Sequence, residues 1–220
     1  MTARIAFILT LLAVRSVQCA PCEVRSALVV KLFNDVQLGK EVLQPAESHA
    51  RLLLSSLCVD VNWSHCKNAT FTKPVECENP SGRIELHLLG LPLVESRQDA
   101  LGLAILDSSH AAAYVSRIRE VAVANPSTID LPVLLGYVIA HELGHVVLHS
   151  NAHPKLGIMA GDFGPWELAL MGQLRLKFTK HEQDAARSRL TAKHNGTART
   201  PGTHAANDQP RRTSAENVER

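Results

Sequence analysis

An apolar segment that follows Asp130 and continues to about Leu148 constrains the fold more than any other part of the sequence. Asp130 is a favourable helix N-cap, and Pro132 falls in the first turn, where proline is tolerated. One face of the predicted helix carries the apolar side chains Leu134, Leu135, Val138 and Ile139. Such a face is stable only when it is buried, so we predict that this helix packs into the core of a domain.

The chain before this helix is predicted to consist mostly of strands. We predict strands over 24–33, 59–63, 84–88, 101–106 and 112–118, and one helix over 45–57. The continuous apolar run 101–106 is typical of a central strand that is buried on both faces. The weaker strand 112–118 is expected at a sheet edge.

The chain after this helix is predicted to be helical. Pro165 is expected to open one helix, and Thr179 with Glu182 forms a capping-box pattern for a last short helix that ends near Leu190. Residues 191–220 lose the periodicity of a helix or strand, so we expect a disordered tail. Because strands come first and helices last, the sequence predicts an α+β fold.

The first 19 residues have the order of a secretory signal peptide. Arg4 precedes an apolar stretch over 5–14, and smaller residues follow before Ala20. The apolar stretch is about half the ~20 residues that a membrane-spanning helix needs. We therefore expect an exported protein, extracellular or periplasmic, that is not inserted in a membrane after cleavage near Ala20. The alternatives are an uncleaved anchor or a buried N-terminal strand.

Cleavage there would leave four cysteines, Cys22, Cys58, Cys66 and Cys77. Four thiols in an exported chain suggest two disulfides. Cys66 and Cys77 flank a polar, loop-like stretch and form the more local pair, which leaves Cys22 for Cys58. A four-cysteine zinc site is the alternative, but no C-x-x-C spacing supports it.

The charge of the chain is nearly balanced, with 23 Lys and Arg residues against 21 Asp and Glu residues. The formal net charge of +2 provides no electrostatic basis for binding nucleic acid. We therefore expect no nucleic-acid partner. We also expect a monomer.

The predicted apolar helix carries His141 and His145, which are four residues apart. At that spacing the two imidazoles share one helix face and can bind the same metal ion. Glu142 lies one position round the helix, close enough to reach a water on the metal without ligating it. This is the H-E-x-x-H arrangement of zinc hydrolases. The alternative is a pair of histidines that are exposed or pack without a metal.

A catalytic zinc needs a third protein ligand. On an unbroken helix His149 would lie about 12 Å from His141 along the axis, at ~1.5 Å per residue. Two nitrogens that are each ~2.0–2.1 Å from one zinc cannot be so far apart, so His149 fits only if the helix ends before it. His153 follows residues that are typical of a helix end. We favour His153, with Glu167 as the alternative.

These residues and a following methionine resemble the zincin metalloproteases, particularly the metzincin branch with its methionine turn. The matching residues are His141, Glu142, His145, His153 and Met159. Metzincins carry H-E-x-x-H-x-x-G-x-x-H, whereas here Leu148 replaces the glycine and Asn151 stands at the usual third-histidine position. The stretch HELGHVVLHSNAHPKLGIM also resembles a group of largely uncharacterised, secreted bacterial zincin-like proteins.

The resemblance implies a zincin-like metallopeptidase domain over residues 20–190, in which a small mixed twisted sheet precedes an active-site helix and C-terminal helices. It implies that Zn²⁺ is bound by three histidines, namely His141, His145 and His153. Glu142 would act as general base on a zinc-bound water, and Met159 would form an apolar floor under the imidazoles. The implied activity is that of a secreted metalloendopeptidase.

The substrate implied by the resemblance is a peptide or protein that pairs with an edge strand, for which residues 112–118 are the candidate. One alternative is a gluzincin-like peptidase with Glu167 as third ligand. Another is a non-catalytic secreted zinc-binding or interaction domain. The intact Glu142 argues against the latter, because a pure binding role does not need it.

Overall fold

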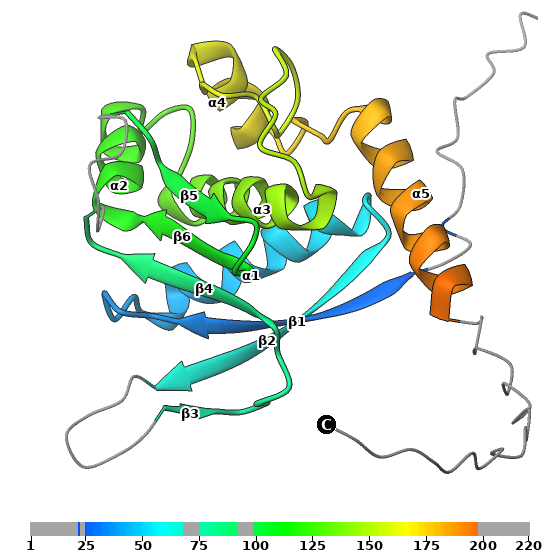
Figure 1. Ribbon diagram of the computed structural model, residues 1–220. Helices are drawn as coiled ribbons and strands as arrows, with labels where there is room; N and C mark the ends of the chain where they lie inside the picture. Colours follow the sequence, from blue (N-terminus) through cyan, green and yellow to red (C-terminus); the bar gives the residue numbers. More distant parts are fainter. Residues whose placement is uncertain (1–21, 23–24, 68–74, 92–98, 198–220) are drawn as a thin grey trace, which may run out of the picture.

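The computed structural model describes residues 22, 25–67, 75–91 and 99–197, and these contain a six-stranded sheet with the strand order β3-β2-β1-β4-β6-β5 (Figure 1). The strands are β1 (Ser26–Phe33), β2 (Val59–Lys67), β3 (Glu76–Cys77), β4 (Ile84–Leu89), β5 (Gly102–Ile105) and β6 (His110–Tyr114). The four inner strands run parallel to one another. The short edge strands β3 and β5 are antiparallel to their neighbours, so the sheet is mixed.

Five helices accompany the sheet in the described part of the chain, and they confirm the predicted α+β class. They are α1 (Lys40–Ser55), α2 (Val115–Ala124), α3 (Leu131–Leu148), α4 (Pro165–Gly172) and α5 (Lys180–Thr197). Parallel strands need a crossover connection, and helix α1 provides it between β1 and its parallel neighbour β2. Helix α2 was not predicted, and its first residues fall in the segment that we expected to complete a strand over 112–118.

Helix α1 begins earlier than predicted, at Lys40 rather than Pro45. A proline inside a helix removes one backbone hydrogen bond, which made Pro45 look like a first-turn residue. Burial of Leu43 and Ala46, on either side of the proline, favours the longer helix.

The edge of the sheet next to α3 is β5, and this corrects two expectations. The run 101–106 is not a central strand, since β5 pairs only with β6 among the described strands and the side chain of Ile105 is 49% exposed. The segment 112–118 is not an edge strand, because β6 lies between β4 and β5 and α2 begins at Val115. A short apolar run does not reveal how many neighbouring strands a strand has. The apolar run 101–106 was therefore wrongly predicted to lie in the centre of the sheet.

Helix α3 is the predicted apolar helix, and its start is fixed as expected. The Asp130 carboxylate accepts a hydrogen bond from the Val133 backbone N–H at 2.9 Å. Helices α1 and α3 lie side by side and both contact the sheet (Figure 1). They approach closely at Gly136, where a Cβ atom would lie 2.7 Å from the Cβ of His49.

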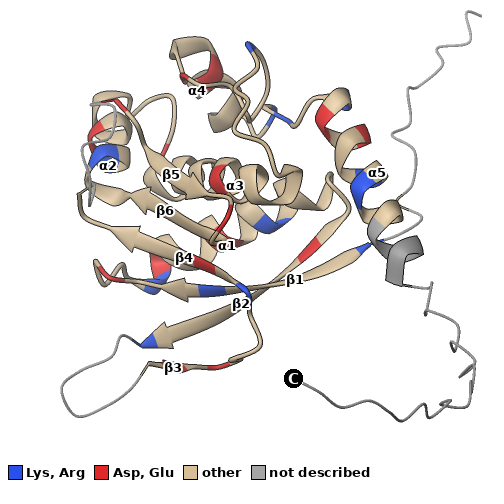
Figure 2. Cartoon of the chain, viewed as in Figure 1, with Lys and Arg blue, Asp and Glu red and all other residues tan. Residues whose placement is uncertain are grey.

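Helix α3 is long and apolar enough to cross a membrane by length and composition alone, but 72% of it is buried inside the domain. Glu142 is the only charged residue between Leu131 and Leu148, so α3 is otherwise tan in Figure 2. Burial in the core accounts for the apolar composition of the helix. Burial of the helix also places the Glu142 carboxylate in the core, where charged residues are rare.

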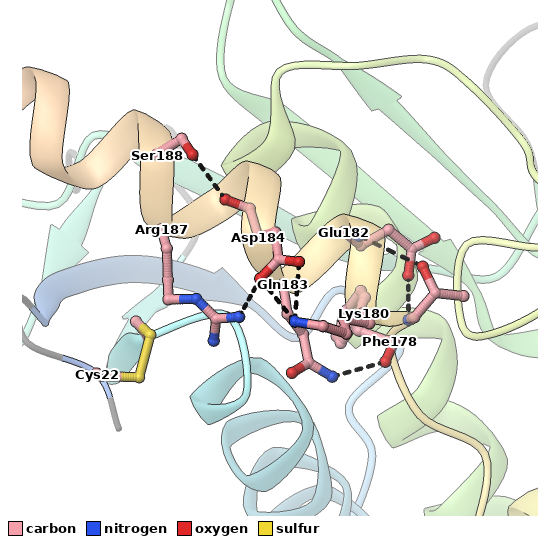
Figure 3. Close-up of polar contacts among 10 residues, drawn as sticks. Cys22, Phe178, Lys180, Glu182, Gln183, Asp184, Arg187 and Ser188 are labelled. Atoms are coloured by element: carbon pink, nitrogen blue, oxygen red, sulfur yellow. Dashed lines mark hydrogen bonds and ion pairs between the residues drawn. A yellow bond between two sulfur atoms is a disulfide. The ribbon is translucent and has the colours of Figure 1, made fainter. Parts of the chain in front are cut away.

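Helix α5 begins with the predicted capping box, and Figure 3 shows the Glu182 side chain that takes part in it. The Thr179 backbone N–H donates to the Glu182 carboxylate at 2.6 Å, and the Glu182 N–H donates to the Thr179 hydroxyl at 3.3 Å. The helix ends at Thr197 and not near Leu190. A helix that is already nucleated can add residues of ordinary propensity without an apolar face, which periodicity cannot detect. Residues 198–220 of the predicted tail lie outside the described residues.

The structure contains two disulfides, Cys22–Cys58 and Cys66–Cys77, which are the pairs that the sequence favoured. The first joins residue 22 to the segment that leads into β2. The second joins β2 to β3 at paired positions, so the stretch that we predicted as a loop begins and ends in strands. Two disulfides are compatible with an extracellular location. The predicted signal peptide over 1–19 lies outside the described residues.

Candidate metal centre

Three histidine side chains converge at the C-terminal half of α3. His141 and His145 share one face of the helix, and His153 approaches them from the loop that follows. The Nε2 atom of His145 lies 3.1 Å from the Nε2 of His141 and 3.1 Å from the Nε2 of His153. Two nitrogens on one tetrahedral zinc, each ~2.0–2.1 Å from it, lie roughly 3.3 Å apart. Two of the three distances therefore match the spacing of metal ligands, and all three ligand atoms lie within 4.8 Å of one another.

Backbone carbonyls determine which ring nitrogen of each helical histidine carries the proton. His141 Nδ1 lies 2.7 Å from the carbonyl oxygen of Ile158, and His145 Nδ1 lies 2.6 Å from that of Ser150. A carbonyl can only accept a hydrogen bond, so each Nδ1 is the donor and each neutral ring presents a lone pair at Nε2. Two lone pairs facing each other at 3.1 Å repel, and a cation between them converts that repulsion into coordination.

The surroundings of His141 and His145 keep these two histidines neutral. Burial lowers the pKa of His141 to about 4; its hydrogen bond to Ile158 opposes the shift, and the neighbouring His145 and His153 add to it. Burial also lowers the pKa of His145, with a further contribution from His153. Neutral imidazole is the form that binds a metal, so the site is prepared for a cation at neutral pH.

The loop after α3 is shaped so that His153 can reach the helix. Helix α3 ends at Leu148, and His149 adopts a left-handed conformation with φ 47° and ψ 52°. This turns the chain back toward the helix, and His153 arrives beside His145 while staying exposed. Gly161 lies against His153, where a Cβ atom would be 3.3 Å from the Cβ of the histidine.

Met159 packs against α3, the helix that carries His141 and His145. It is buried and follows Ile158, whose carbonyl accepts the hydrogen bond from His141. A Cβ atom on Gly144 would lie 2.6 Å from the Met159 sulfur, so the methionine packs against α3 next to His145. The apolar floor that the resemblance implies under the imidazoles stays a prediction.

Glu142 points into the same site from α3. Its side chain is buried, with only 5% of the residue exposed, and burial raises the pKa of its carboxyl group to about 8. A cleft of about 660 Å³ contains this residue and all three histidines. The other walls of the cleft come from β5 and the residues just before it, from Val121 of α2, and from the loop between α3 and α4. A metal ion, a carboxylate and a bound ligand can therefore meet in one cleft.

Two candidate ligands do not join the cluster. Helix α3 ends before His149, which is the condition under which His149 could have been a ligand. His149 is nevertheless exposed and is not part of the group that could hold a metal. Glu167 is in the first turn of α4, with its carboxylate near Gly164, and is not part of the group that could hold a metal. Among the described residues, His153 is the third member of the group that could hold a metal.

Other contributors to the site could not be found from the sequence. The Phe163 ring packs edge-on against His141, with ring centroids 5.7 Å apart. Ser150 and Ile158 contribute through their backbone carbonyls, so the identity of their side chains does not indicate this role. Gly102 of β5 lies against the Glu142 carboxylate, and no motif marks it.

The fold and site define an α+β domain with a candidate three-histidine metal centre in a cleft at the sheet edge. No family model matches the chain, and no curated protein matches it either. Among solved structures, the chain is similar to the crystal structure of archaemetzincin from Methanopyrus kandleri, with 14% sequence identity. The match covers 78% of this chain and 99% of that chain, at a TM-score of 0.47. A likeness this remote assigns neither a family nor an activity. A function for this chain therefore rests on the geometry of its own site.

Proposed function

We propose that this chain is a zinc-dependent metalloendopeptidase that hydrolyses peptide bonds. The observation that carries the proposal is the convergence of the Nε2 atoms of His141, His145 and His153 in a cleft that also contains the carboxylate of Glu142. Three imidazoles form a donor set that suits zinc and leaves a fourth position open. Bound there, zinc would supply a Lewis acid that polarises the scissile carbonyl and acidifies the attacking water.

Glu142 is the proposed general base. Its carboxylate takes a proton from the attacking water and passes it to the leaving amine. Without a cation, burial raises the pKa of Glu142 to about 8, which would leave the group largely protonated at neutral pH. A positive charge held by the histidines lowers this pKa, because it favours the carboxylate form. The metal and the base are therefore coupled in this proposal.

The proposed substrate is a peptide or protein bound along β5. This strand replaces residues 112–118 in that role, because β5 is the edge of the sheet and lines the cleft through Gly102, Leu103 and Ala104. An extended peptide can pair with such an edge through its main chain. The scissile bond would then lie across the cleft between the edge strand and the histidines.

We further propose that the protein is exported as a monomer, to the outside of the cell or to the periplasm. The predicted leader over residues 1–19 and the two disulfides support this location. The alternative of a non-catalytic zinc-binding domain does not account for Glu142, whose buried carboxyl group costs stability unless it has a role.

The proposal is tested by zinc content and casein cleavage of the purified protein, before and after treatment with a chelator and after zinc is added back. We expect about one zinc per chain, loss of cleavage with the metal, and recovery on its return. Cleavage that continues in metal-free protein would contradict the mechanism. Zinc binding without any cleavage would favour the non-catalytic alternative.

A further inference from the structure

The edge strand and the active-site helix touch where Gly102 meets Glu142. A Cβ atom built on Gly102 would lie 2.8 Å from the carboxyl carbon Cδ of Glu142 and closer still to its Oε1. Carbon atoms that are not bonded do not approach so closely. The Glu142 carboxylate therefore occupies the space that any side chain at position 102 would need.

The pattern of β5 shows how this contact arises. Side chains alternate between the two faces of a strand, so Gly102 and Ala104 share one face, whereas Leu103 and Ile105 share the other. The face with the small residues is the one that meets Glu142, and α3 packs directly against β5. Small residues on this face allow the helix to lie close to the strand.

The surroundings leave the carboxylate few other positions. Glu142 is buried in the described structure, so a methyl group at position 102 would push its carboxylate toward neighbouring core atoms or out into the cleft. The same methyl group would lie 2.7 Å from the carbonyl oxygen of Ala112 on β6. Two effects of a substitution must therefore be separated, one on Glu142 and one on the pairing of β5 with β6.

We propose that Gly102 is a positioning residue for Glu142: by having no side chain, it leaves the space between β5 and α3 in which the carboxylate is held beside the histidines. This inference rests on the proposed function for the role of Glu142 in catalysis. The steric relationship between the two residues does not depend on that function. It can therefore be tested separately.

The first test compares Gly102→Ala with Gly90→Ala, since a Cβ at Gly90 would meet only Val36, at an ordinary 3.7 Å. We expect Gly102→Ala to keep its zinc and to change KM for casein by less than about threefold, while kcat falls by roughly 10- to 100-fold, because a misplaced catalytic group mainly affects the chemical step. Gly90→Ala should behave like wild type. An unchanged kcat in Gly102→Ala would overturn the proposal.

The second test is a double-mutant cycle with a shorter acid. Glu142→Asp should itself lower kcat, but adding Gly102→Ala should lower it by less than about threefold more, because the shorter side chain no longer meets the methyl group. A substitution that only disturbed the contact with Ala112 would lower kcat by the same factor in both backgrounds. That result would overturn the proposal.

The third test needs no activity. We expect Gly102→Ala to lower the Tm of the metal-free protein, and the loss to shrink by at least half in the Glu142→Ala background, where the carboxylate is absent. Equal losses of Tm in both backgrounds, or a failure to fold in both, would assign the effect to Ala112 and overturn the proposal. If wild type binds zinc but cleaves nothing, the proposed function fails. The Tm cycle still shows whether a side chain at position 102 meets the Glu142 carboxylate.

Discussion

The Nδ1 atom of His141 lies 2.7 Å from the carbonyl oxygen of Ile158, the residue immediately before Met159. This one hydrogen bond connects α3 to the loop that passes beneath the site. It sets the tautomer of His141 and brings the segment that contains Met159 against the helix. The candidate metal centre is therefore held by two parts of the chain that are joined through a backbone group.

His153 is the ligand whose assignment most needs a test, because it is exposed and lies outside the helix. We expect His153→Ala to lose much of its zinc and its casein cleavage, since two histidines alone bind the metal far more weakly. The measurement is zinc per chain after gel filtration. His149→Asn is the matched control, because asparagine tolerates the left-handed conformation of that residue and should leave zinc unchanged. Full zinc retention by His153→Ala would exclude this ligand.

Met159 should contribute to stability as well as to the site. Its side chain is 1% exposed, so Met159→Ala should lower the free energy of unfolding by about 2–5 kcal/mol through the cavity that it creates. Met159→Leu nearly conserves the volume and should cost less than about 1.5 kcal/mol. Urea unfolding of the metal-free protein measures both. Equal stability of the two variants would show that Met159 does not pack as described.

The start of α3 depends on the Asp130 cap. Asp130→Ala removes the acceptor for the Val133 N–H and should destabilise the protein by about 1 kcal/mol, whereas Asp130→Asn keeps an acceptor oxygen and should cost much less. Urea unfolding of the two variants beside wild type provides the comparison. If asparagine and alanine were equally harmful, the cap would not be the cause.

A pH-dependent contribution to stability is expected from His65 on β2, far from the histidine cluster in sequence. Its Nε2 lies 2.7 Å from the carboxylate of the buried Glu47. Burial lowers the pKa of His65, but the hydrogen bonds and charges of Glu47 and Glu78 outweigh that effect, so the pKa is raised above 6.5.

Because the folded state raises this pKa, the stabilisation is complete below pH 6.5, the ordinary value for histidine, and is lost as the pH rises through the folded-state pKa. The difference in unfolding free energy between wild type and His65→Gln should therefore be largest in mildly acidic buffer and should shrink toward alkaline pH. A difference that stays constant or grows with pH would contradict the assignment.

Local signals in the sequence predicted much of the fold. Asp130 and the pair Thr179 and Glu182 act on backbone groups within a few residues, so they marked the starts of α3 and α5 correctly. Periodicity could not distinguish a central strand from an edge strand, because that depends on which strand pairs with which. The predicted positions of β5 and β6 in the sheet were wrong for this reason.

The same limit applies to the candidate site. The spacing of His141 and His145 on a helix follows from helix geometry alone, and the structure places the two rings together. The contacts of Gly102 and of Phe163 with the site arise from tertiary packing between segments that are distant in sequence. No pattern within either segment encodes the other, so these residues became visible only in the folded chain.

The most direct test of the proposed function is the zinc content and casein cleavage of Glu142→Gln. Glutamine nearly preserves the shape of the side chain but cannot accept the proton, so we expect one zinc per chain, as in wild type, and a loss of kcat of at least about 100-fold. Zinc binding with undiminished cleavage would contradict the central claim that Glu142 is the general base of a zinc peptidase.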